Sequence, residues 1–314
     1  MLESFWAMVT DPNAQWILLG CMLLGLCSGV IGCFAYLRKQ SLMGDTLAHA
    51  ALPGICIAFM LTGTKSIGLF LLGAGAAGLL ATFGIGLITR YSRIKTDAAM
   101  GIVLSSFFGL GIVLLTKIQH SDYGNQSGLD KFLFGQAASM IGSDVNAMLI
   151  VSLVIIAACT LLFKEFKLLA FDPGFARGLG FPVAFLDQLL MFFIVVAVVA
   201  GIQAVGVVLV AALLITPAVS ARYWTDRLGT MVVLAGVFGL LSGAVGTWLS
   251  STTASLPTGP VSVLAQTLLF GVSLLFGPRR GLLAKRLSHT RARRTLIHEQ
   301  TMQLNVSGKE ERPL

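Results

Sequence analysis

The chain has 314 residues, of which 22 are Lys or Arg and 14 are Asp or Glu. Charged residues make up 11 % of it, against roughly 25 % in a soluble globular domain, and the mean hydropathy is +0.86. So little charge cannot cover a water-soluble fold, which excludes a soluble enzyme, a disordered chain and a secreted disulfide scaffold.

Uncharged runs long enough to cross a bilayer recur along the chain. A spanning helix needs about 20 apolar residues. Runs of at least 19 uncharged residues lie at 12–37, 46–64, 66–89, 98–116, 145–163, 188–221 and 228–278. The last run is divided by the turn 256–260, and 188–221 is too long for one crossing, with Gly201 and Gly206 near its middle. We therefore predict an all-α polytopic membrane protein with eight or nine transmembrane helices.

An acidic residue and a histidine lie four residues apart at the start of the second span, Asp45 and His49. On a helix this spacing places both side chains on one face. A charge inside a span costs about 3 kcal/mol on insertion scales, which makes a functional role the default. A carboxylate and an imidazole together suit Mn²⁺, Fe²⁺ or Zn²⁺. The alternative is that Asp45 caps the helix start and His49 bonds to a neighbouring helix; the residues alone leave both interpretations open.

Two prolines interrupt the predicted apolar helices: Pro53 lies four residues after His49, and Pro217 lies in the run 188–221. Pro53 cannot donate to the carbonyl of His49, which leaves that oxygen available as a third ligand or a hydrogen-bond acceptor. Thr216-Pro217 likewise frees the carbonyl of Leu213. Breaks of this kind often line a transport pathway, so we predict Pro53, Thr216 and Pro217 as pathway residues.

The loop at 164–187 carries the signals of a short helix. Asp172 suits the N-cap and Pro173 the first helical position, whereas Gly180 lies where the helix must end. Such a helix would present the apolar side chains Phe171, Phe175, Leu179 and Phe181. These side chains form a docking surface for another protein, or they pack back onto the membrane interface; their chemistry favours neither.

Basic residues gather in alternate loops, which predicts the orientation. By the positive-inside rule these loops are cytoplasmic; they lie at 38–39, 90–95, 164–177 and 222–227, and the C-terminal tail is the fifth basic segment. The position of the tail directly after a span favours contact with anionic lipids over nucleic acid. We divide the chain into a transmembrane domain at 1–277 and a basic cytoplasmic tail at 278–314.

Familiar catalytic motifs are missing or lie in the wrong context. The sequence has neither GxxxxGK[ST] nor HExxH, so it predicts no enzyme, and any energy source is another polypeptide or an ion gradient. The GxGxxG match at 73–78 lies inside an apolar run and indicates helix packing. Five cysteines fall in apolar spans without CxxC pairing, which indicates small buried hydrophobes.

Taken in order, these segments resemble the permease subunits of bacterial ABC importers for manganese, zinc and iron. The resemblance covers about residues 5–283. The motifs that carry it lie at 37–45, 48–50, 52–54, 171–173, 175–176, 206–214, 216–218 and 256–260. The stretch at 124–137 resembles the manganese-type branch in particular.

The resemblance implies roles for two groups of residues. Asp45 and His49 match the metal-site pair of the family within the membrane. The helix at 172–180 matches the coupling helix that is seated in the ATPase, and its residues here are Asp172, Pro173, Phe175, Ala176 and Gly180.

The resemblance also implies cargo and partners. It implies cytoplasmic ABC ATPase subunits, an extracytoplasmic metal-binding lipoprotein, and a second permease that is another copy or a paralogue. The expected cargo is Mn²⁺, with Zn²⁺ or Fe²⁺ as alternatives, and no cofactor is bound permanently. The expected location is the bacterial cytoplasmic membrane, where alternating access moves the ion inward. The rival interpretation is a gradient-driven metal transporter that works alone.

Overall fold

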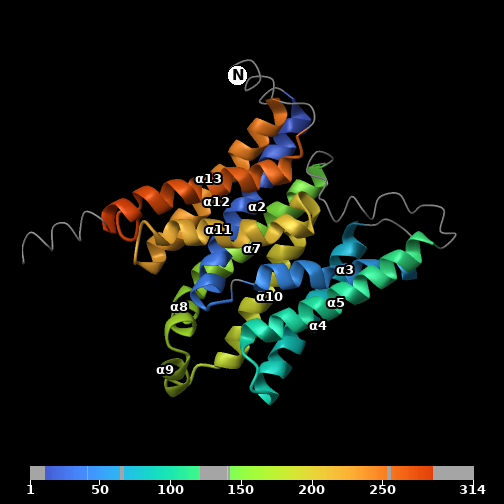
Figure 1. The fold of residues 1–314 in the computed structure, drawn as a ribbon, viewed down its shortest axis with the longest axis horizontal. Coiled ribbons are helices and arrows are strands. Elements are labelled where there is room, and N and C mark those ends of the chain that lie inside the picture. The colour runs from blue at the N-terminus through green and yellow to red at the C-terminus, as the bar shows by residue number, and fades with distance from the viewer. Residues whose placement is uncertain are drawn as a thin grey trace, which may run out of the picture.

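The computed structural model describes residues 11–40, 42–63, 67–120, 140, 142–252 and 256–285. Over these residues the chain forms helices joined by turns, with no strand (Figure 1). The motif predicted at 124–137 and the tail from 286 onward lie outside the described residues. The helices are α2 (Pro12–Leu37), α3 (Met43–Thr62), α4 (Ile67–Tyr91), α5 (Thr96–Gln119), α7 (Gly142–Leu161), α8 (Phe163–Phe171), α9 (Pro173–Gly178), α10 (Val183–Val205), α11 (Val207–Arg222), α12 (Leu228–Thr252) and α13 (Thr258–Phe276).

Eight of the described helices are long and apolar enough to cross a membrane: α2, α3, α4, α5, α7, α10, α12 and α13. This count agrees with the lower of the two predicted numbers, and α11 is an additional, shorter apolar helix of 16 residues. The predicted break in 188–221 occurs at Gly206, whose φ of 88° suits glycine. Gly201 lies inside α10 instead, where its missing side chain makes room for Val210 of α11.

Helix α2 lies at the centre of the bundle and packs against α7, α10, α11 and α12 (Figure 1). Its contact with α12 is made backbone to backbone. A Cβ added at Gly25 would lie 2.1 Å from the carbonyl oxygen of Gly239, and one at Gly29 would lie 2.3 Å from that of Ala235. Small residues of this kind let membrane helices approach closely. Gly25 and Gly29 therefore serve the packing of α2 against α12.

Helices α3, α4 and α5 lie side by side at one flank of the bundle (Figure 1). The backbones of α3 and α4 meet at Gly54, where an added Cβ would lie 2.1 Å from the carbonyl oxygen of Gly73. Gly73 opens the GxGxxG match, which therefore serves helix packing, as predicted. Helix α3 also packs against α11, so it joins this flank to the other side of the bundle.

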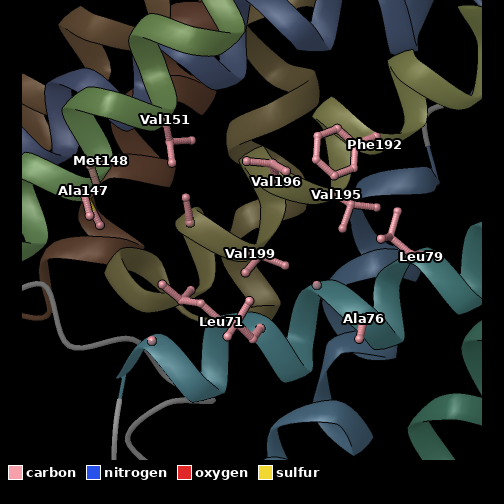
Figure 2. Close-up of a pocket in the computed structure, with 14 residues that line it drawn as sticks. Leu71, Ala76, Leu79, Ala147, Met148, Val151, Phe192, Val195, Val196 and Val199 are labelled. Carbon is pink, nitrogen blue, oxygen red and sulfur yellow. The ribbon is translucent and has the colours of Figure 1, made fainter.

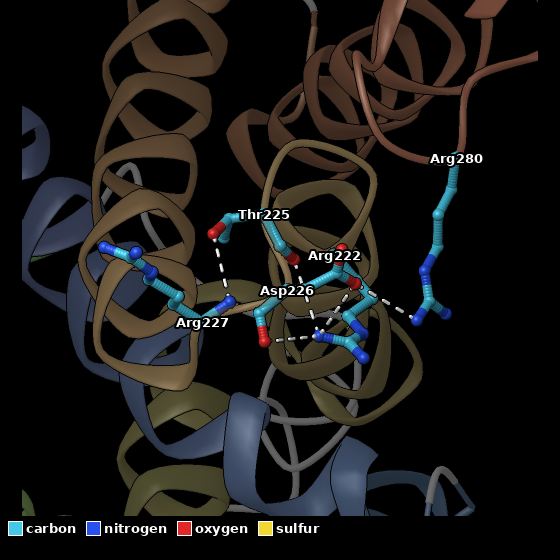
Figure 3. A network of polar contacts seen from close by, with 5 residues as sticks. All are labelled: Arg222, Thr225, Asp226, Arg227 and Arg280. Atoms are coloured by element: carbon cyan, nitrogen blue, oxygen red, sulfur yellow. Dashed lines mark hydrogen bonds and ion pairs between the residues drawn. The ribbon is translucent and has the colours of Figure 1, made fainter.

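The turn between α11 and α12 is bound to the segment that follows α13. Figure 3 shows Asp226 between two arginines, with carboxylate contacts of 3.6 Å to Arg222 and 3.2 Å to Arg280. Nearby, the indole N–H of Trp224 donates to the hydroxyl of Ser273 at 3.0 Å. These contacts hold α13 against the α11–α12 turn.

The five cysteines are buried and unbonded to one another, as predicted.

Replacing Gly25 by Val should push α2 away from α12, because the contact leaves no room for a side chain. Overpacking of this kind costs about 1–3 kcal/mol, so we expect a lower Tm for the detergent-solubilised protein. Gly101→Val is the matched control, since a Cβ at Gly101 of α5 would meet nothing within 4 Å. Equal Tm values for the two variants would contradict the proposed importance of this contact.

Candidate functional site

Asp45 and His49 lie next to each other on α3, as their spacing predicts. The imidazole Nε2 of His49 is 3.4 Å from the carboxylate Oδ1 of Asp45, and the side chains are 20 % and 38 % exposed, respectively. The ring of His49 packs edge-on against Phe108 of α5, with centroids 4.8 Å apart. The two groups are therefore close enough to bind one cation from two sides, and an aromatic ring lies beside the imidazole.

The structural roles considered as alternatives from sequence are not seen among the described residues. Leu42 occupies the N-cap of α3 and makes no side-chain cap bond, while Asp45 lies in the first helical turn. His49 Nδ1 is buried and has no hydrogen-bond partner in the described part of the chain. A negative charge in a first turn is favoured by the helix dipole, so Asp45 can stabilise the start of α3 without capping it.

Pro53 lies in the interior of α3, which continues through it to Thr62. Its neighbour Gly54 is where α3 touches the backbone of α4. The proline nitrogen has no hydrogen to donate, so the His49 carbonyl one turn earlier lacks its usual helical donor. The structure thus places an acceptor oxygen on the residue that also carries the imidazole.

Pro217 lies inside α11 and is buried, with Thr216 half-buried beside it. The hydroxyl of Ser220 donates a hydrogen bond of 2.8 Å to the Thr216 carbonyl, next to Pro217. Helix α11 also packs on the start of α3: a Cβ added at Gly44 would lie 3.1 Å from Leu214. The two proline-containing helices are therefore in direct contact just before Asp45.

The short helix predicted after Asp172 is α9. The Asp172 carboxylate accepts a hydrogen bond of 2.9 Å from the Phe175 backbone N–H, and Pro173 occupies the first position of the helix. Gly180 has a φ of 85°, in the left-handed region. Ala176 is buried at 1 % exposure, whereas Phe175 is 57 % exposed.

Helix α9 projects beyond α8 at one margin of the bundle (Figure 1). Four large apolar side chains around it are exposed: Phe171, Phe175, Leu179 and Phe181. An exposed apolar group on a short, capped helix provides a surface for a partner. The same group of side chains would also suit the membrane interface, the alternative that the sequence left open.

Sequence reasoning missed an ion pair between α2 and α10. The guanidinium Nη1 of Arg38, at the C-cap of α2, contacts the carboxylate Oδ1 of Asp187 in α10. Burial lowers the pKa of Arg38 below its ordinary value. Arg38 lies in a basic loop and in the motif at 37–45, and Asp187 borders an uncharged run. An acidic residue just inside one span and a basic residue just outside another would have been the available signal.

An apolar cavity of about 520 Å³ lies between α4, α7 and α10 (Figure 2). Its walls include Leu71, Met148 and Val195, and none of the predicted metal or coupling residues lines it. Such a lining offers no ligand to a divalent ion. Among the described residues, no group of three or more His, Cys, Asp or Glu side chains could hold a metal. Asp45 and His49 are thus two adjacent potential ligands, with no third His, Cys, Asp or Glu beside them among the described residues.

Comparison with known proteins identifies relatives over most of the chain. The model of a family described as "ABC 3 transport family" matches residues 10–277. The manganese transport system membrane protein MntC of Bacillus subtilis (strain 168) is 55 % identical over 96 % of this chain and 69 % of its own length. The zinc transport system membrane protein TroC of Treponema pallidum (strain Nichols) is 45 % identical over 90 % of this chain and 95 % of its own length.

A solved structure has the same fold. The structure of PsaBC from Streptococcus pneumoniae in complex with Fab superposes with a TM-score of 0.78, at 32 % identity. The match covers 91 % of this chain and 99 % of that chain. The all-helical membrane fold predicted from the sequence is confirmed by this match and by the eight apolar helices.

Proposed function

The chain belongs to the ABC 3 transport family, and from this premise we propose that it is the membrane-spanning permease of an ATP-binding-cassette importer for a divalent transition metal. We propose Mn²⁺ as the cargo, because a manganese system is among its relatives at 55 % identity. Zn²⁺, the cargo named for the Treponema relative, and Fe²⁺ are the alternatives, since a carboxylate and an imidazole bind all three ions.

The adjacent carboxylate and imidazole of Asp45 and His49 carry this proposal. They lie 3.4 Å apart on a helix long and apolar enough to cross a membrane. An ionisable residue inside a span is by default a candidate for a functional site such as an ion pathway. Two protein ligands with water in the remaining positions bind weakly enough to release the ion, as transport requires. The pathway passes Pro53 within α3 and Thr216-Pro217 within α11, although both helices continue through their prolines.

The energy source we propose is a pair of separate ABC ATPase subunits, because the sequence has no phosphate-binding loop. Helix α9 is the coupling helix: its cap at Asp172 orders it, and exposed Phe175 would enter the ATPase. ATP binding and hydrolysis would displace α9 and switch the pathway between outward-open and inward-open states. The chain has no catalytic site of its own and holds no permanent cofactor.

The remaining parts of the assembly follow from the family and from charge. An extracytoplasmic metal-binding lipoprotein would deliver the ion, and a second permease, identical or paralogous, would complete the pathway. By the positive-inside rule we propose that α9 and the C-terminal tail lie on the cytoplasmic side of the bacterial cell membrane, which requires α11 to cross the membrane in addition to the eight longer helices.

ATP-dependent uptake by the reconstituted assembly tests the proposal. The permease in liposomes with its ATPase should accumulate Mn²⁺ when ATP and the loaded binding protein are present, and should accumulate none without ATPase. Unlabelled Mn²⁺ should compete better than Zn²⁺ or Fe²⁺. Gradient-driven uptake by the permease alone would contradict the proposal and favour a transporter that works alone.

Asp45→Asn preserves the shape of the side chain and removes its charge, so it should weaken the metal site. Loss of a residue that only hydrogen-bonds to a metal ligand already lowers metal affinity about 10- to 100-fold. We therefore expect uptake to fall at least about tenfold in Asp45→Asn, and we expect the same fall in His49→Gln. Asp97→Asn is the matched control, because Asp97 is an exposed first-turn acidic residue of α5. Uptake at the wild-type rate by Asp45→Asn would refute the ligand role.

Phe175→Asp should detach the ATPase or uncouple it, because a charge would replace the exposed apolar group of α9. Truncating a hot-spot residue at an interface typically costs about 2 kcal/mol or more of binding free energy, which is roughly 30-fold in affinity. Co-purification of the ATPase measures the effect. Leu282→Asp, at an exposed apolar residue beyond α13, is the control. Unchanged co-purification and uptake for Phe175→Asp would favour packing of this residue at the membrane interface.

A further inference from the structure

The ion pair between Arg38 and Asp187 joins two helices that have separate tasks in the proposed transport cycle. Arg38 ends α2 immediately before the turn into α3, the helix that carries Asp45. Asp187 lies in the second turn of α10, the helix that follows α9. The Arg38 and Asp187 side chains are 16 % and 40 % exposed, respectively. Their contact is thus better shielded from water than a surface ion pair, and screening weakens it less.

The chain between Arg38 and Asp45 is held by backbone hydrogen bonds. Lys39 has a φ of 58°, the left-handed conformation that closes a helix in a Schellman motif. The bonds run from Lys39 N–H to Tyr36 at 3.0 Å, from Gln40 N–H to Ala35 at 3.0 Å, and from Met43 N–H to Gln40 at 3.1 Å. A displacement of Arg38 therefore moves the first turn of α3, which contains Asp45.

The chain between α9 and Asp187 is closed by the same motif. Gly180 takes the left-handed conformation. The bonds run from Gly180 N–H to Arg177 at 3.0 Å, from Phe181 N–H to Ala176 at 3.1 Å, and from Val183 N–H to Phe181 at 2.8 Å. Helix α9 is thus tied directly to the start of α10, and a displacement of α9 reaches Asp187.

These observations define one continuous connection, and from it we propose that Arg38 and Asp187 are positioning residues that transmit movement of α9 to Asp45. The inference rests on the proposed function and extends it to residues outside the metal site and the coupling helix. Apolar packing also joins α10 to α3, but apolar surfaces can slide past each other. A charge-assisted contact has a fixed partner and direction, so it keeps the two helix ends in register.

The test uses the reconstituted complex of permease, ATPase and binding protein, and measures Mn²⁺ transported per ATP hydrolysed. Arg38→Gln and Asp187→Asn should each lower this ratio at least about fivefold, the lower range of allosteric coupling. ATP hydrolysis, co-purification of the ATPase and Tm should stay close to wild type. The charge exchange Arg38→Asp with Asp187→Arg should restore the ratio, because it re-forms the pair in the opposite sense.

Asp226→Asn provides the control, since it breaks an ion-pair network that joins other elements (Figure 3). The inference is overturned if the single variants keep the wild-type ratio, if they lose transport and hydrolysis in proportion together with Tm, or if the exchanged pair folds without restoring the ratio. A wild-type complex that transports none of Mn²⁺, Zn²⁺ and Fe²⁺ would overturn the proposed function, and this inference with it. If the wild-type complex transports normally, a contrary result from the variants overturns this inference and leaves the proposed function standing.

Discussion

Backbone contact along α2 is the interaction on which the arrangement of the bundle depends. Gly25 and Gly29 let α12 approach without intervening side chains, and Gly32 does the same for α11, where an added Cβ would lie 1.8 Å from the Leu214 carbonyl oxygen. Between membrane helices the hydrophobic effect supplies little attraction, so close packing must supply it. The position of α11 on α2 then determines where α11 meets α3 at Gly44, beside the proposed metal ligand Asp45.

Features that depend on local sequence could be predicted. Spans follow from the absence of charge, because a bilayer excludes it. The cap at Asp172 follows from a residue type whose conformational preference acts over a few positions. The adjacency of Asp45 and His49 follows from helical spacing alone. Each of these predictions needed no knowledge of which helices touch.

Features that depend on tertiary packing could not be predicted. Arg38 and Asp187 are separated by 149 positions, and their places at the ends of two spans do not say which helices bring them together. Gly201 and Gly206 looked equivalent in sequence, yet one packs inside α10 and the other ends it. The ring of Phe108 beside His49 comes from α5, a helix whose register against α3 no periodicity reveals. Long-range pairing, not local propensity, determines these details.

The location of Asp45 would let the proposed two-ligand site serve both binding and release. A ligand in the middle of a span would be held by packing on all sides, and its geometry would change little. Asp45 instead lies in the first turn of α3, directly after the turn that carries Arg38, whereas His49 lies one turn deeper against Phe108. A small rotation of the first turn would move the carboxylate relative to the imidazole. Such a change weakens a site that has only two protein ligands far more than it would weaken a closed cage.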